Sequence, residues 1–225
     1  MSAYEPFHQH DLTRFAYYCS LLGVVIAVLG IFISIFAAIS QLGINVLQMR
    51  IDQLGDYLNS PLAYVFNISL LLCGAFFTFA MGGLIRQRFS HSADLLAIFG
   101  GITGMGLVIV GWYPYNDIKP HQVGELIYVV GSILVFSMLI YSFFYCKMMC
   151  GRITLGLSIL GLISGIELLR HVNLGDLDYH VCDHGDCYLY PVMWLHSLMA
   201  IFTALSMAST VMRLGVSRQQ LISEI

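Results

Sequence analysis

The sequence predicts an all-α, polytopic integral membrane protein with six transmembrane helices. Apolar residues make up 58% of its 225 residues, charged residues only 10%, and the mean hydropathy is +0.80. A soluble domain carries about a quarter charged residues. The apolar residues also gather in six runs, and a bilayer core requires roughly 20 residues of helix. We therefore expect one transmembrane helical-bundle domain over residues 1–225, in which each helix satisfies its own backbone polar groups.

The six apolar runs predict spans at approximately 15–40, 61–85, 93–113, 121–146, 153–170 and 190–213. The first run is longer than the apolar region of a signal peptide, and no small-residue cleavage pattern follows it, so we interpret it as a span. The second is expected to begin at Pro61, because a proline in the first helical turn loses no hydrogen bond. Pro114 and Pro120 enclose a turn between the third and fourth runs. The connection between the fifth and sixth runs contains two cysteines.

The basic residues predict the orientation. With odd-numbered helices running outward, seven of them fall on one face of the membrane: Arg14, Arg86, Arg88, Lys147, Arg152, Arg213 and Arg218. Three fall on the other face: Arg50, Lys119 and Arg170. Because cytoplasmic connections carry the excess of Lys and Arg, we expect both termini in the cytoplasm. Most acidic residues and histidines then lie toward the outer face, which is where any chemistry is expected.

Two stretches resemble a known family. The stretch "DQLGDYLNSPLAYVFNISLLLCGAFF" is similar to a Leu-Gly, small-Pro and Phe-Asn signature, and "GMGLVIVGWYPYNDIKPHQVGELIYVVG" to a Gly-rich helix that ends in an aromatic-Pro turn followed by His. Both resemble the uncharacterised prokaryotic membrane family named domain of unknown function 998. The resemblance covers roughly residues 15–213 and implies the six-helix layout, with no established activity. It singles out Gly55, Pro61, Asn67, Pro114 and His121.

Polar residues at one depth of the expected bundle are the candidate site. Asn67, Glu125, Glu167 and His196 each lie about one or two turns inside the outer end of a span. Ionisable groups at such a depth usually face the bundle interior or a wet cavity. His121 and Glu125 are spaced i,i+4, as are Glu167 and His171, so each pair shares a helix face. We expect these residues to meet in one outer pocket, to which the Pro114–Pro120 turn also presents Asp117.

The residue types leave three interpretations of this pocket open. His121, Glu125, Glu167 and His196 could hold a divalent metal, although the spacing differs from the Glu-x-x-His of di-metal bundles. Without a metal, His121 or His196 could act as general base on a lipid head group, with Glu125 or Glu167 as the orienting residue. In the third interpretation these groups satisfy one another and hold the helices in register.

Two further predictions concern the longest connection and the setting of the protein. Cys182 and Cys187 face the oxidising side and are expected to form a disulfide; a metal site with His180 and His184 is the alternative. We expect a multi-pass protein of a cell membrane, such as a prokaryotic inner or plasma membrane. Its partners are the lipid bilayer and other membrane subunits, not nucleic acid. A structural or accessory subunit is the leading function, a lipid- or headgroup-processing enzyme is the alternative, and a small-solute carrier is third.

Overall fold

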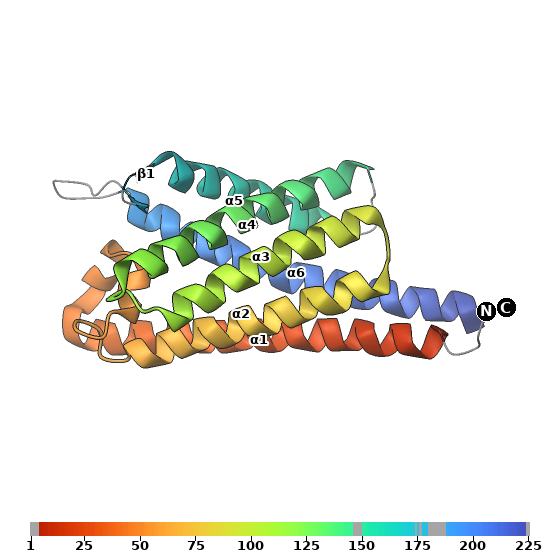
Figure 1. Ribbon diagram of the computed structural model, residues 1–225, viewed down its shortest axis with the longest axis horizontal. Coiled ribbons are helices and arrows are strands. Elements are labelled where there is room, and N and C mark those ends of the chain that lie inside the picture. The colour runs from red at the N-terminus through yellow and green to blue at the C-terminus, as the bar shows by residue number, and fades with distance from the viewer. Residues whose placement is uncertain (1–4, 146–149, 174, 176, 180–187, 224–225) are drawn as a thin grey trace.

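The computed structural model is a bundle of six long helices that run alternately up and down (Figure 1). It describes residues 5–145, 150–173, 175, 177–179 and 188–223. The helices are α1 (Glu5–Leu42), α2 (Ala63–Gln87), α3 (His91–Trp112), α4 (Ile118–Tyr145), α5 (Arg152–Arg170) and α6 (Leu189–Ser223). Each packs against the next, and α6 returns to α1, which closes the ring. All six are long and apolar enough to cross a membrane, which confirms the predicted all-α architecture.

The helix bounds lie within two residues of the predicted spans except at three ends. Helices α1 and α6 have 38 and 35 residues, or about 57 and 52 Å at 1.5 Å per residue, and both extend past the apolar runs. The extensions lie at the same end of the bundle (Figure 1). Helix α4 begins at Ile118, so Pro120 lies within its first turn, where a missing N–H leaves no hydrogen bond unmade. Helix α2 begins at Ala63, two residues after Pro61.

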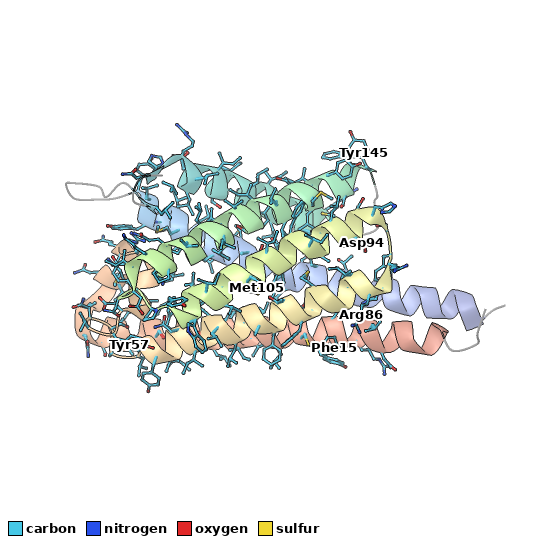
Figure 2. All side chains as sticks on the ribbon, in the orientation of Figure 1. Phe15, Tyr57, Arg86, Asp94, Met105 and Tyr145 are labelled. Carbon is cyan, nitrogen blue, oxygen red and sulfur yellow. The ribbon has the colours of Figure 1, made fainter. Side chains whose placement is uncertain are left out.

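Large apolar side chains cover the outside of the bundle, while polar ones are buried within it. Phe36 and Phe79 are 62% and 60% exposed, whereas Asn67, His121 and His196 are each 1% exposed. Figure 2 shows the side chains that surround the helices, with Tyr57 at one end and Arg86 at the other. A contiguous apolar exterior of this kind is unusual for a soluble protein and suits contact with lipid.

Close packing of α2, α3 and α4 depends on glycines at the helix crossings. A side chain at Gly111 of α3 would meet the backbone of α2 at Asn67 and Leu71. A side chain at Gly124 of α4 would meet Val110 of α3, with the backbone nitrogen at 2.9 Å. Helices approach closely where no Cβ intervenes. These crossings fix the positions of Asn67 and of the first turns of α4.

The connection between α1 and α2, residues 43–62, covers one end of the bundle, and we call it the capping segment. It contains two short 3₁₀ helices, η1 (Gly43–Gln48) and η2 (Ile51–Gly55). Val46 and Leu54 are fully buried, in one apolar cluster with Ala38 of α1 and Phe66 of α2. The capping segment therefore packs as part of the core, and it lies opposite the end that carries the start of α1 and the end of α6 (Figure 1).

The connection between α5 and α6 begins with a short hairpin. Strand β1 (Val172–Asn173) pairs antiparallel with β2 (Asp178–Tyr179), and Val172 lies opposite Tyr179. The predicted disulfide between Cys182 and Cys187 and its alternative, a metal site with His180 and His184, lie outside the described residues. Among the described cysteines, Cys19, Cys73 and Cys150 are free thiols.

Candidate functional site

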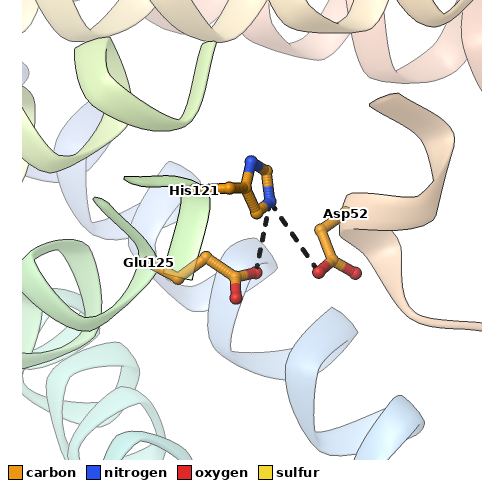
Figure 3. A group of neighbouring side chains, drawn as sticks. All are labelled: Asp52, His121 and Glu125. Carbon is orange, nitrogen blue, oxygen red and sulfur yellow. Dashed lines mark ion pairs between the residues drawn. The ribbon is translucent and has the colours of Figure 1, made fainter. Parts of the chain in front are cut away.

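Three ionisable side chains meet beneath the capping segment: Asp52 from η2, and His121 and Glu125 from successive turns of α4. One ligand atom from each lies within 4.8 Å of the other two. His121 Nε2 is 3.9 Å from Asp52 Oδ2 and 3.9 Å from Glu125 Oε1. Figure 3 shows the same ring nitrogen directed between the two carboxylates. The i,i+4 spacing places the two α4 residues on one face, as the sequence predicted.

Arg50 completes this group, and we call Arg50, Asp52, His121 and Glu125 the polar cluster. The Arg50 Nε lies 3.1 Å from both carboxylate oxygens of Asp52, and the Arg50 Nη2 donates to Asp52 Oδ2 at 2.6 Å. The same Nη2 donates to Glu125 Oε2 at 3.3 Å. Glu125 thus directs one oxygen toward Arg50 and the other toward His121. Charge-assisted bonds of this kind are the strong ones, and they join the capping segment to α4.

The backbone fixes the orientation of the His121 ring. His121 Nδ1 lies 2.7 Å from the carbonyl oxygen of Tyr113, the residue that follows α3. A carbonyl only accepts, so Nδ1 carries a proton and donates it. In a neutral ring Nε2 then carries the lone pair. This nitrogen is buried and has no hydrogen-bond partner among the described residues.

Tyr115 lies beside the cluster. The Arg50 guanidinium carbon lies 5.6 Å from the centroid of the Tyr115 ring, and the His121 ring meets the same ring edge to face at 6.0 Å. An aromatic face attracts a guanidinium, and the ring also excludes water. With a neutral His121, the two carboxylates and one guanidinium carry a net charge of minus one.

An apolar cavity of about 130 Å³ begins at the polar cluster and continues into the bundle. Asp52 and Glu125 are its only charged lining residues within the described part of the chain. The remaining lining comes from Ile51 of η2 and from α1, α2, α3, α4 and α6, and it includes Ala27, Phe66 and Ala200. The bundle therefore holds one continuous site with carboxylates at its capped end and hydrocarbon along its length.

His196 belongs to a different group. Its Nε2 lies 2.8 Å from Ser132 Oγ of α4, and its Nδ1 lies 3.1 Å from Ser164 Oγ and 3.2 Å from the carbonyl oxygen of Gly161, both in α5. The Phe136 ring packs edge to face against it. Both hydroxyls also donate to carbonyls of their own helices. His196 thus joins α4, α5 and α6, and it does not line the cavity.

Glu167 and His171 form a third group, at the end of α5. Glu167 Oε2 accepts from Arg170 at 3.0 Å, and Tyr188 Oη lies 3.2 Å from Glu167 Oε1 and 2.6 Å from His171 Nε2. Partial burial and the neighbouring Glu167 carboxylate raise the pKa of the Tyr188 hydroxyl. The Arg170 side chain is 70% exposed, which makes this a surface group. The structure therefore does not bring Glu125, Glu167 and His196 into the single pocket that the sequence led us to expect, nor all four residues of the predicted metal set.

The two other predicted pocket residues have structural contacts. Asn67 Nδ2 donates to the carbonyl oxygen of Gly55 at 2.9 Å, which fastens the capping segment to α2. Asp117 is exposed and precedes the first residue of α4, where its carbonyl oxygen accepts from the His121 backbone N–H. Neither residue lines the cavity.

Hydrogen bonds around Asp56 fasten the far end of the capping segment. Burial would raise the pKa of Asp56, but hydrogen bonds from the Asn59 side chain, the Leu58 N–H and the Asn116 side chain outweigh it and lower the pKa. Asn116 lies in the turn between α3 and α4, and its Oδ1 also accepts from the Tyr57 N–H at 2.9 Å. The capping segment and the turn between α3 and α4 are thereby held together.

The sequence did not identify Arg50 and Asp52 as site residues. They come from a connection, where no helical period relates them to α4. A signal was nevertheless present: in "MRIDQLG" the two charges alternate with Met49 and Ile51, and Leu54 follows two residues after Asp52. A charged pair among apolar residues of an otherwise packed connection indicates side chains that turn inward to a partner.

The chain matches no protein-family model, no curated protein and no solved structure. Its resemblance to the family named domain of unknown function 998 stays an expectation. The polar cluster and the cavity are therefore the features that bear on function.

Proposed function

We propose that the protein binds a small amphiphile within its helical bundle, or the end of a larger one. The observation that supports this is the continuity of the site, in which Asp52 and Glu125 line the same cavity as Ala27 and Phe66. Ligand sites are typically apolar with a few converging polar groups. A cavity of about 150 Å³ accepts benzene, so about 130 Å³ fits roughly six carbon atoms. The apolar part of the ligand occupies the cavity, and its polar head meets the cluster.

The test compares a variant that fills the cavity with one that changes the outside of the same helix. Ala27 is 3% exposed and lines the cavity, whereas its neighbour Val28 is 41% exposed. The full chain in detergent micelles is titrated with alkyl phosphates and alkyl amines of about six carbons, and its melting temperature is followed. We expect one head-group series to stabilise the wild type and V28F but not A27F.

Equal stabilisation of A27F and V28F would place the ligand elsewhere and overturn the proposal. So would the absence of any shift with both head-group series. Filling an apolar cavity does not by itself destabilise a bundle when the added volume matches the space. The melting temperature of A27F without ligand therefore controls for misfolding.

A structural or accessory subunit is the second candidate, and the attachments of the capping segment favour it. Trp194 Nε1 of α6 donates to the carbonyl oxygen of Met49 at 3.1 Å, and Asn67 and Arg50 join the same segment to α2 and α4. Under this reading the cluster only holds helices together. D52N and E125Q would then change the melting temperature but leave any amphiphile response intact.

The proposed setting is a cell membrane, with the capped end facing outward. The excess of basic residues in the sequence at the opposite end supports this orientation. The resemblance described above supports a prokaryotic inner or plasma membrane. A cysteine introduced beside Arg218 should resist membrane-impermeant reagents in intact cells and react after permeabilisation. Equal labelling before and after permeabilisation would reverse the orientation.

A further inference from the structure

We propose that the polar cluster is a binding site for one divalent transition metal ion, held by Asp52 Oδ2, His121 Nε2 and Glu125 Oε1. Carboxylates that gather at a buried position do not by themselves make such a site. The histidine supplies the independent observation: His121 is 1% exposed, and its Nε2 has no hydrogen-bond partner in the described chain. That nitrogen is directed at both carboxylates (Figure 3).

The tautomer of His121 suits a metal ligand. Donation from Nδ1 to the Tyr113 carbonyl leaves the lone pair of the neutral ring on Nε2. Histidines that bind metals usually donate their other ring N–H to a carbonyl or carboxylate, which orients the ring and increases its basicity. The second interaction that a metal-binding histidine requires is therefore already present.

The distances also suit a metal. Bonds from zinc to nitrogen or carboxylate oxygen are about 2.1 Å, so two atoms that share an ion lie no more than about 4.2 Å apart. The nitrogen of His121 lies 3.9 Å from each carboxylate oxygen, within that limit. The two oxygens lie within 4.8 Å of each other, so they would have to approach by at most about 0.6 Å to share the ion. One nitrogen and two oxygen ligands favour zinc, cobalt or manganese over magnesium and calcium, which prefer oxygen alone.

Arg50 occupies one oxygen of Glu125 and contributes one positive charge to the site. It occupies Glu125 Oε2 and leaves Oε1 directed toward His121. Asp52 Oδ2 accepts from Nη2 of Arg50, and Nε of Arg50 lies equally close to both oxygens, so a metal bound at Oδ2 would leave Nε to donate to Oδ1. Without a metal the cluster carries minus one, with a neutral His121; with a divalent ion it carries plus one. The remaining coordination positions would therefore attract an anion.

The positive charge of the metal-loaded cluster also specifies the head group of the proposed ligand. This step rests on the proposed function. Asp52 and Glu125 both line the cavity, so the open side of the metal would face the apolar space. An amphiphile held there should carry an anionic head, such as a phosphate. The metal-loaded protein should then respond to alkyl phosphates, and the chelator-treated protein should not.

Metal content is measured first, without amphiphile, so that the two proposals can fail separately. The full chain in detergent is stripped with a chelator, reloaded with Zn²⁺, freed of excess metal and analysed by mass spectrometry for metal per chain. Cobalt replaces zinc in a second sample, because its visible absorption reports nitrogen and oxygen ligands. We expect about one ion per chain, a Co²⁺ spectrum, and a rise in melting temperature on loading.

H121Q and E125Q should each lose the bound ion, the spectrum and the rise in melting temperature. H196Q is the matched control, because His196 is equally buried but bonds to serines. A second control, C182S/C187S/H180Q/H184Q, removes the alternative ligands of the long connection. Circular dichroism and gel filtration identify any variant that fails to fold, and the milder D52N then replaces it.

Three results would overturn the proposal. The wild type could retain no metal after reloading, H121Q and E125Q could retain as much as the wild type, or the control variant of the long connection could lose the ion. If zinc binds as expected but neither alkyl phosphates nor alkyl amines do, the metal site stands and the proposed function fails. If alkyl phosphates bind equally with and without metal, the ligand site stands but the metal does not hold the head group. If alkyl amines bind instead, the ligand site stands and the anionic head is wrong.

Discussion

Removal of Arg50 should destabilise the protein far more than removal of another arginine that also makes an ion pair. The Arg50 and Asp52 side chains are 8% and 4% exposed, and their closest atoms lie 2.6 Å apart. In R50M the carboxylates of Asp52 and Glu125, which are 4% and 15% exposed, lose their guanidinium partner. Breaking a buried pair from one side costs about 3–5 kcal/mol. That corresponds to a fall of roughly 6–20 °C in melting temperature for a chain of this size.

Arg170 provides the control at the same end of the bundle. It pairs with Glu167 at 3.0 Å, but its side chain is 70% exposed. An exposed pair contributes at most about 1 kcal/mol, so R170M should lower the melting temperature by no more than roughly 4 °C. The assay is thermal unfolding of the full chain in detergent, followed by a thiol-reactive dye and by tryptophan fluorescence.

A double variant that also removes the charge of Asp52 separates the effect of unbalanced charge from the effect of lost packing. If unbalanced charge causes the cost, R50M/D52N should be more stable than R50M alone, because one uncompensated carboxylate is gone. R50K retains the charge without the two-pronged geometry and should fall between the wild type and R50M. The reasoning fails if R50M melts within about 2 °C of R170M. It also fails if the fall in melting temperature of R50M/D52N equals the sum of the falls in R50M and D52N.

Three other predictions follow from the same structure. G55A should lower stability by about 1–3 kcal/mol, because the added methyl meets the Asn67 side chain, and the cost should shrink in an N67A background. H196L should cost no more than about 1–3 kcal/mol, because Ser132 keeps its helical carbonyl partner, and it should leave metal content unchanged; lost metal would contradict the site. The lowered pKa of Asp56 means that its contribution is complete above about pH 5 and is lost as the pH falls through the folded pKa. In D56N the melting temperature should therefore fall less as the pH is lowered below about 5. The same fall as in the wild type would contradict this.

The helices could be predicted from the sequence because what forms them is local. A run of apolar residues of bilayer length specifies a span, whatever packs against it. The runs did not reveal that α1 starts at Glu5 and α6 continues to Ser223. Outside the hydrocarbon, polar residues such as those in "VSRQQLIS" can continue a helix, so the end of an apolar run does not end the helix.

The candidate site could be predicted only in part, because depth along a helix does not give direction around the bundle. Spacing correctly placed His121 and Glu125 on one face. Glu167 lies at a similar depth, but α5 contributes no lining residue to the cavity, so Glu167 pairs at the surface with Arg170 instead. His196 points between α4 and α5. Asp52 reaches the site because the capping segment packs onto the end of the bundle, and a helical repeat in the sequence does not predict that packing.

The capping segment links the polar cluster to access to the cavity. Ile51 and Asp52 of η2 line the cavity, and the same short helix is joined to α4 through Arg50 and to α2 through Gly55. A ligand that entered from the capped end by moving η2 away from α4 would break the Arg50–Glu125 contact. A metal that attracts Asp52 and Glu125 together would hold η2 against α4 and oppose the same movement. If both proposals hold, occupation of the cluster and closure of this end of the bundle are coupled through Asp52, which belongs to the cluster and to η2.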